Sequence, residues 1–243
     1  MNVQNIVAEV REYGFSVCEG FLPVERCEQA RLSIDELIVK YPSAISLTSS
    51  DSRVFGAEFL SNIIKSDFYS DDFINKTLCQ LYGVNQLVAG TILAQHVKAI
   101  PGNTGSGGVW HRDSLPDQYK AFLYFSEITD ISGPLQLLPK THTALSKAIA
   151  SIKRGREWNS LDYNSADIVN QKAGPNPSIV SVTGKPGTLV FVNTSILHRG
   201  KPGLERERYS ATYYAFKSPM PSHINEFVMR SKDLAQAAAS DHV

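Results

Sequence analysis

The second half of the chain is a succession of short apolar runs, each of which ends near glycine or proline. The runs with the composition of β-strands are residues 87–100, 120–128, 135–138, 179–182, 188–192 and 209–216. Turn residues such as Pro134 and Gly187 stop these runs from joining into longer elements. Strands this short bury their apolar residues by pairing side by side and packing sheet against sheet, so the pattern predicts a β-sandwich or barrel here.

The first half of the chain has a helical pattern instead. Apolar residues recur at helical spacing in residues 3–13 and 24–39. A third helix is expected at 71–81, where Ser70 or Asp71 can cap its first turn. The segments expected between and after these helices are a strand at 14–22, a serine-rich loop at 43–52, a strand at 53–60 and a terminal helix at 223–239.

Strands gathered in one half and helices in the other predict a mainly β fold with some α structure. The expected architecture is a double-stranded β-helix, a jelly-roll or cupin-like barrel backed by N-terminal helices. A segregated α+β sandwich is the alternative. No linker interrupts residues 1–243, so one domain is expected, with helical support over 1–83 and the jelly-roll core over about 87–217.

The composition excludes some partners. Lys and Arg together number 24, as do Asp and Glu, so there is no net positive charge to attract nucleic acid or an anionic membrane. No apolar run approaches the roughly 18 residues of a membrane span, and no secretory signal is visible. Three scattered cysteines suit reduced thiols in the cytoplasm. The expected partner is therefore a soluble small molecule; the oligomeric state is left open.

One short motif in the β-rich half carries metal-binding chemistry. His111 and Asp113 follow a glycine-rich loop at 102–108. In extended backbone, side chains two residues apart share a face, so His111 and Asp113 would lie together with Arg112 turned away. Two histidines and one carboxylate make up the facial triad that holds non-haem Fe(II). The motif therefore needs one further histidine.

His198 is the candidate for that histidine. It follows the strand at 188–192 and a polar turn, which would place it at the mouth of the predicted barrel, facing the His-x-Asp motif. Arg208 begins the next strand, ten positions further on. Its guanidinium can form a two-point ion pair with a carboxylate, a geometry that lysine cannot supply.

Three segments, in order, resemble the phytanoyl-CoA dioxygenase family of Fe(II)- and 2-oxoglutarate-dependent oxygenases. They are Pro101-Gly102 with Trp110-His111-Arg112-Asp113, residues 132–142 with the sequence SGPLQLLPKTH, and residues 186–191 with His198-Arg199-Gly200 and Arg208. The similarity extends over about 87–216, more than half of the chain.

The resemblance implies a ligand set and a co-substrate site. The implied iron ligands are His111, Asp113 and His198. Arg208 would pair with the far carboxylate of 2-oxoglutarate, and Gln95 and Tyr124 would lie near that co-substrate; O2 is the other reactant.

The sequence departs from the family pattern in two places. Arg208 comes one residue earlier after the distal histidine than is usual, and Arg206 on the same strand face is the fallback. Lys140 stands where the family has glycine, although His142 is kept and would support the site by bonding backbone. Asp113 is intact, which argues against the similar halogenating enzymes, since these lack the carboxylate.

Three residues are candidates for contact with the substrate. Trp110 would wall the pocket or belong to the core, and Gln136 would face the barrel interior between two leucines. Trp158 lies in the long polar segment 153–177, which we interpret as a lid or substrate loop because long irregular loops in compact domains are usually functional or disordered.

These features predict a 2-oxoglutarate-dependent dioxygenase that hydroxylates a soluble small molecule and releases succinate and CO2. One alternative is a non-catalytic jelly-roll module that binds a small molecule or sugar. Another is a cupin-type metal isomerase. Neither alternative needs the triad of His111, Asp113 and His198 together with an arginine that clamps a carboxylate.

Overall fold

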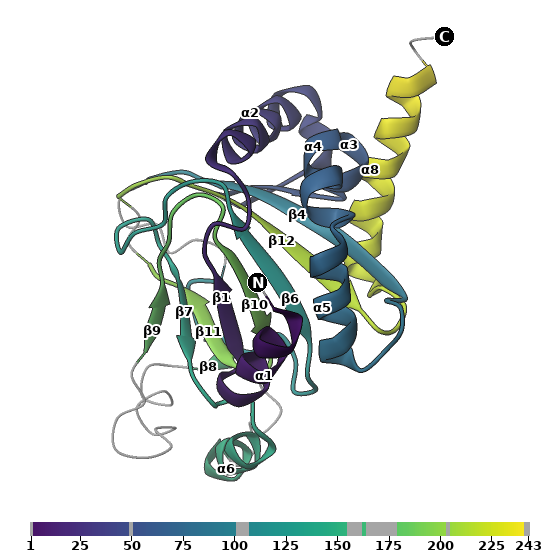
Figure 1. Ribbon diagram of the computed structural model, residues 1–243. Helices are drawn as coiled ribbons and strands as arrows, with labels where there is room; N and C mark the ends of the chain where they lie inside the picture. Colours follow the sequence, from purple (N-terminus) through teal and green to yellow (C-terminus); the bar gives the residue numbers. More distant parts are fainter. Residues whose placement is uncertain are drawn as a thin grey trace.

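Two antiparallel β-sheets and a group of helices form the structure, a computed structural model that describes residues 2–48, 51–100, 107–154, 162–163, 179–202 and 205–240 (Figure 1). The sheets face each other across a common interior, and most of the helices lie behind the larger sheet. The prediction of a mainly β, jelly-roll fold backed by helices is therefore confirmed.

The larger sheet has seven strands in the order β1-β10-β6-β12-β4-β3-β2. Their bounds are β1 (Phe15–Cys18), β2 (Ile45–Thr48), β3 (Asp51–Phe55), β4 (Ala89–Val97), β6 (Tyr119–Tyr124), β10 (Leu189–Asn193) and β12 (Arg208–Phe216). At its centre β12 pairs with both β4 and β6. Along each of these three strands, alternate side chains point to the inner face of the sheet.

The smaller sheet has five strands in the order β8-β5-β11-β7-β9. Their bounds are β5 (Trp110–His111), β7 (Leu135–Leu138), β8 (Asp162–Tyr163), β9 (Val180–Val182) and β11 (Leu197–Gly200). These strands are short, and β11 lies between β5 and β7. The segment that carries His111 (110–111) and the segment that carries His198 (197–200) are thus neighbours in one sheet.

The helices pack mainly on the outer face of the larger sheet. Their bounds are α1 (Val3–Tyr13), α2 (Val24–Lys40), α3 (Ala57–Leu60), α4 (Asn62–Ile64), α5 (Asp72–Tyr82), α6 (Ala144–Arg154) and α8 (Ser222–Ser240), with short turns of helix at Pro42–Ala44 and Lys65–Tyr69. Asp71 caps α5, its side chain accepting a hydrogen bond from the amide of Ile74 at 2.9 Å. None of the helices in the described ranges is both long enough and apolar enough to cross a bilayer.

Each face of the larger sheet has its own apolar cluster. The outer cluster joins the helices to the sheet, for instance Ile34 of α2 and Leu78 of α5 with Leu123 of β6, all fully buried. The inner cluster lies between the sheets and includes Val190 of β10 and Leu137 of β7.

The secondary structure predicted from the sequence is wrong over part of residues 43–60. A loop is expected at 43–52, but β2 and β3 pair there as a hairpin at the edge of the larger sheet. A strand is expected at 53–60, but it ends at Phe55, because Gly56 takes a left-handed conformation with φ of 73° and α3 begins directly after it. Pairing of β2 with β3, and of β3 with β4, holds in the sheet a serine-rich segment that has little strand propensity by itself.

Gly187 gives a stability prediction. It has φ of +86°, and a Cβ at this position would overlap the carbonyl oxygen of Leu22. Gly187→Ala should therefore lower the free energy of unfolding, measured by urea denaturation, by about 2–4 kcal/mol, from left-handed strain plus overpacking. Gly20→Ala is the matched control, since Gly20 has φ of +65° but nothing within 4 Å; it should cost only about 1 kcal/mol. Equal losses would contradict the overpacking.

Candidate metal centre

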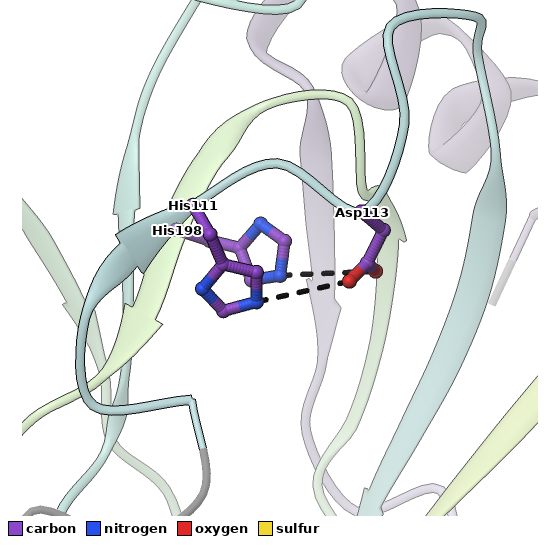
Figure 2. Close-up of side chains that lie close together, drawn as sticks. All are labelled: His111, Asp113 and His198. Atoms are coloured by element: carbon purple, nitrogen blue, oxygen red, sulfur yellow. Dashed lines mark ion pairs between the residues drawn. The ribbon is translucent and has the colours of Figure 1, made fainter. Parts of the chain in front are cut away.

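His111, Asp113 and His198 come together in the structure (Figure 2). His111 on β5 pairs directly with His198 on β11, and their ring centroids are 4.3 Å apart. Asp113 follows β5, so its carboxylate reaches both rings. The Nε2 atoms lie 3.7 Å (His111) and 3.8 Å (His198) from its two oxygens. One potential ligand atom from each residue falls within a 4.8 Å cluster, which is the spacing expected around a single ion.

The hydrogen bonds of the two rings fix which nitrogen faces the cluster. Nδ1 of His111 lies 2.8 Å from the carbonyl oxygen of Val109, and Nδ1 of His198 lies 2.9 Å from that of Ile196. A carbonyl oxygen only accepts, so in each neutral ring Nδ1 carries the proton and Nε2 presents its lone pair. Two imidazole lone pairs and one carboxylate therefore converge, and this donor set fits a divalent metal such as Fe(II) with further positions open.

Asp113 is ionised because a lysine stands beside it. Nζ of Lys120 on β6 lies 2.8 Å from Oδ2 of Asp113. Burial by itself would raise the pKa of Asp113, but the Lys120 ammonium more than offsets this and holds the pKa well below its usual range. Burial also lowers the pKa of His198 to about 4, although Asp113 opposes the shift. At neutral pH the site therefore has a charged carboxylate and a neutral His198.

Arg112 connects the two segments that carry the metal-site residues. It points away from Asp113, as the extended pattern predicts, and is buried at 1% exposure. Its Nη1 donates to the carbonyl oxygens of Thr141 and Ser195, and the amide of Asp113 donates to Thr194 at 3.0 Å. The Thr141 hydroxyl in turn accepts from the amide of Leu197 at 2.9 Å. These bonds fix the turn before His198 against the His-x-Asp segment.

The three residues open onto a cavity of about 290 Å³ between the sheets. The larger sheet supplies its floor through residues that alternate along neighbouring strands: Arg53 on β3, Leu93 and Gln95 on β4, Lys120, Phe122 and Tyr124 on β6, and Arg208, Ser210, Thr212 and Tyr214 on β12. The smaller sheet contributes Leu135 and Gly200 beside the two histidines. The cavity lining is thus mixed, with charged and polar side chains set among apolar ones such as Leu93, Phe122 and Leu135.

Arg208 lines this cavity, and Arg206 does not reach it. Arg208 begins β12, is partly buried, and donates from Nη1 to the carbonyl oxygen of Gly133, whereas its buried Nε has no hydrogen-bond partner among the described residues. Arg206 lies on the surface in an ion pair with Glu127 at 2.9 Å. Of the two candidate arginines, Arg208 is therefore the one that lines the cavity.

Gln95 and Tyr124 both face the same cavity. In the sheet, Gln95 is opposite Ser210 on β12, and Ser210 is opposite Tyr124 on β6, so the three form one row. Gln95 donates to Asp51 at 3.1 Å, and the Tyr124 hydroxyl donates to the carbonyl oxygen of Val182 at 3.1 Å. This row is two positions along β12 from Arg208, the neighbourhood in which the family resemblance placed them.

The proposed substrate residues are not brought to the cavity. Trp110 packs with Leu138 and Leu197, with the guanidinium of Arg199 4.7 Å from its ring centroid. Gln136 bonds Arg199 and Ser181, so it lies on the opposite face of the smaller sheet from the cavity. Alternation explains this placement, because each is adjacent along its strand to a residue that faces inward. Trp158 lies outside the described residues, as does most of the expected lid at 153–177.

Lys120, Arg53 and Tyr214 are cavity residues that the motif reasoning missed. Lys120 looks like an ordinary strand-end lysine, yet its side chain is only 7% exposed. A signal was present: Lys120 is four residues before Tyr124 and Tyr214 six residues after Arg208, so strand alternation puts each on the face of a residue already assigned. Arg53 gave no such signal, because its strand was not predicted in full.

The pKa of His198 leads to a prediction about stability in the metal-free protein. In the folded protein the pKa of His198 is about 4, below the ordinary histidine value of 6.5, so the unfolded chain binds more protons between these two pH values. The free energy of unfolding should then fall as the pH decreases through this window. Between pH 7 and pH 5, measured with chelator present, wild type should lose on the order of 1–2 kcal/mol more than His198→Gln. Equal losses in wild type and His198→Gln would contradict the lowered pKa of His198 in the folded protein.

Comparison with known proteins agrees with this geometry. A curated relative, L-proline trans-4-hydroxylase from Streptomyces griseoviridis, is 22% identical over 143 residues, which cover 51% of this chain and 53% of the relative, so the match spans about half the length of each. Two similar solved structures are EctD from S. alaskensis with bound Fe (TM-score 0.66, 16% identity, 88% of this chain and 77% of that one) and HygX from Streptomyces hygroscopicus with nickel and 2-oxoglutarate (0.58, 16%, 89% and 88%).

A third similar structure is the epimerase SnoN in complex with Fe3+, alpha ketoglutarate and nogalamycin RO (TM-score 0.61, 14% identity, 93% of this chain and 88% of that one). At these identities the solved structures show the shared fold. The family model for phytanoyl-CoA dioxygenase matches residues 10–204, which is most of the chain and includes all three residues of the cluster. The chain belongs to the phytanoyl-CoA dioxygenase family.

Proposed function

We propose that this protein is an Fe(II)- and 2-oxoglutarate-dependent dioxygenase that hydroxylates a small molecule. The observation that supports this most is one cavity with two ends. His111, Asp113 and His198 converge at one end, and the partly buried Arg208 lies at the other. Iron and 2-oxoglutarate, when bound, would activate O2 and supply the oxidising power, with release of succinate and CO2.

The chain's own residues bind and orient the reactants in this proposal. The triad would hold iron on one face and leave its other positions free for 2-oxoglutarate and O2. Arg208 would pair with the far carboxylate of 2-oxoglutarate; burial lowers the pKa of its guanidinium, but an arginine remains cationic. Gln95 and Tyr124 would contact the co-substrate between these two ends. Enclosure between the sheets limits the access of water.

The two alternative functions, a sugar-binding module and a metal isomerase, each leave part of the cavity without a role. A sugar-binding module has no use for two lone pairs and an ionised carboxylate directed at one point, and a metal isomerase has no use for a partly buried arginine at the far end of the cavity. Burying a guanidinium with an unpartnered Nε costs free energy unless a ligand completes its hydrogen bonds.

The proposal extends to the setting of the enzyme. We infer that residues 1–243 work as one domain, because the outer apolar cluster joins α1, α2 and α5 to the larger sheet. We also place the enzyme in the cytoplasm, which suits its free thiols at Cys18, Cys27 and Cys79. The substrate is a soluble small molecule, since the chain has no net charge to favour nucleic acid or a membrane surface.

Metal binding tests the triad. Anaerobic addition of Fe(II) and 2-oxoglutarate to the apoprotein should produce a weak visible charge-transfer band. Asp113→Ala should weaken iron binding by about 100-fold or more, because it removes the only anionic ligand. Circular dichroism of the variant should remain that of a folded protein. Absence of the band in wild type, together with no succinate in air, would exclude the proposed function.

Arginine substitutions test the co-substrate end. Arg208→Met should weaken 2-oxoglutarate binding by about 10- to 100-fold, the loss expected for a charge-assisted pair. Arg208→Lys should restore little, since lysine lacks the two-point geometry. Arg206→Met is the control, and its affinity for 2-oxoglutarate, measured by calorimetry with Mn(II), should equal that of wild type because Arg206 lies outside the cavity. A loss in the control instead would reverse the assignment.

A further inference from the structure

A second cavity adjoins the metal centre on the side away from Arg208. It measures about 560 Å³ and lies between the loop after Asp113, the end of β12 and the start of α8. The residues that line both cavities are Arg53, Asp113, Lys120 and Tyr214. The metal centre therefore lies at the junction of two spaces, one that ends at Arg208 and one that opens toward α8.

Two cations lie at this junction. Lys120 is buried, with its Nζ 2.8 Å from Asp113 and 3.7 Å from the ring centroid of Tyr214. Arg53 is on β3, which β12 and β4 separate from the strand of Lys120, and its buried Nε has no hydrogen-bond partner among the described residues. The carboxylate beside Lys120 is the one that a metal would also engage. A buried guanidinium with an unpartnered nitrogen is a donor suited to an anion.

The charges around the site do not balance without a further anion. Three side-chain cations, Arg53, Lys120 and Arg208, are set against two carboxylates, the partly buried Asp113 and the buried Asp51 that accepts from Gln95, which leaves one positive charge. A divalent metal and a doubly charged 2-oxoglutarate cancel each other, so loading the site as proposed does not change this excess. In a poorly hydrated site an uncompensated charge is costly, and a bound anion would relieve it.

We propose that Arg53 and Lys120 form a subsite for a carboxylate of the substrate, next to the metal centre and on the side of the second cavity. This inference rests on the proposed function and specifies the class of substrate, a small carboxylic acid. The carboxylate would take hydrogen bonds from the unpartnered Nε of Arg53 and from Lys120, whose pairing with Asp113 would then be shared. The remaining atoms of the substrate would occupy the second cavity.

The position of the subsite sets where the substrate can be oxidised. An anion held beside Asp113 brings the adjoining carbon atoms close to the metal, so oxidation is expected within a few bonds of the carboxylate. Arg208 is not available for this role in the loaded enzyme, because it faces the first cavity alone. The two carboxylate sites therefore serve different molecules.

The test uses protein loaded with Mn(II) and saturating 2-oxoglutarate under anaerobic conditions, so that no turnover occurs. The probes are two matched pairs, acetate with acetamide and cyclopentanecarboxylate with cyclopentanecarboxamide. Binding is measured by the Mn(II)-induced relaxation of probe protons, which reports only molecules near the metal. Each carboxylate should bind at least about 10-fold more tightly than its amide, as expected for a charge-assisted pair.

Variants then assign the preference to the two cations. Arg53→Met and Lys120→Met should each reduce the carboxylate preference by about 10-fold, and Arg53→Met should leave 2-oxoglutarate affinity within about 2-fold of wild type. Circular dichroism shows that each variant is folded. Arg206→Met, a cation on the surface, should keep the full preference.

Several results would overturn the subsite. Equal binding of acid and amide, no probe relaxation, or an unchanged preference in both variants would each remove it. If Arg53→Met weakens 2-oxoglutarate binding instead, Arg53 belongs to the co-substrate site and the inference is wrong. Failure of wild type to bind Mn(II) and 2-oxoglutarate at all would overturn the proposed function, and is thereby distinguished from loss of this subsite alone.

Discussion

The pairing of β5 with β11 is the constraint on which the site depends. It places His111 opposite His198 although 86 residues separate them, and it lets Asp113 reach both rings from the segment that follows β5. Arg112 reinforces the pairing from behind through its bonds to Thr141 and Ser195. Loss of this register would move the histidines to opposite faces, since a shift of one residue reverses every side chain of a strand.

The larger sheet supplies the electrostatics that this pairing needs. Lys120 on β6 forms an ion pair with the ionised Asp113, and Arg208 on β12 lies at the far end of the same cavity. Because the strands run side by side and antiparallel, residues at alternate positions form rows across the floor. The helices behind this sheet bury its outer face, which makes it a firm support for a polar inner face.

The sequence predicted the β-sheets and the start of α5 correctly, but it did not predict every strand or every side chain of the cavity. Short runs punctuated by glycine and proline predicted the β-sheets, and Asp71 predicted the start of α5, because both signals are local. The hairpin of β2 and β3 was not predicted, since β3 is held by pairing with β4 and β2 by pairing with β3, while both have little strand preference of their own. Trp110 and Gln136 were expected near substrate because a pocket suggests aromatic and polar walls, yet alternation turned both outward.

The sequence by itself determined the chemistry that is available: two histidines, one carboxylate and an arginine in the order of a known family, on segments that had to be strands. Only the tertiary structure decided which charged side chains lie next to these residues. Lys120 and Arg53 are ordinary residues in the sequence, and they become part of the site because sheet pairing brings β3 and β6 to the same cavity. Local patterns encode which face a side chain takes, whereas neighbours across a sheet depend on contacts between residues far apart in the chain.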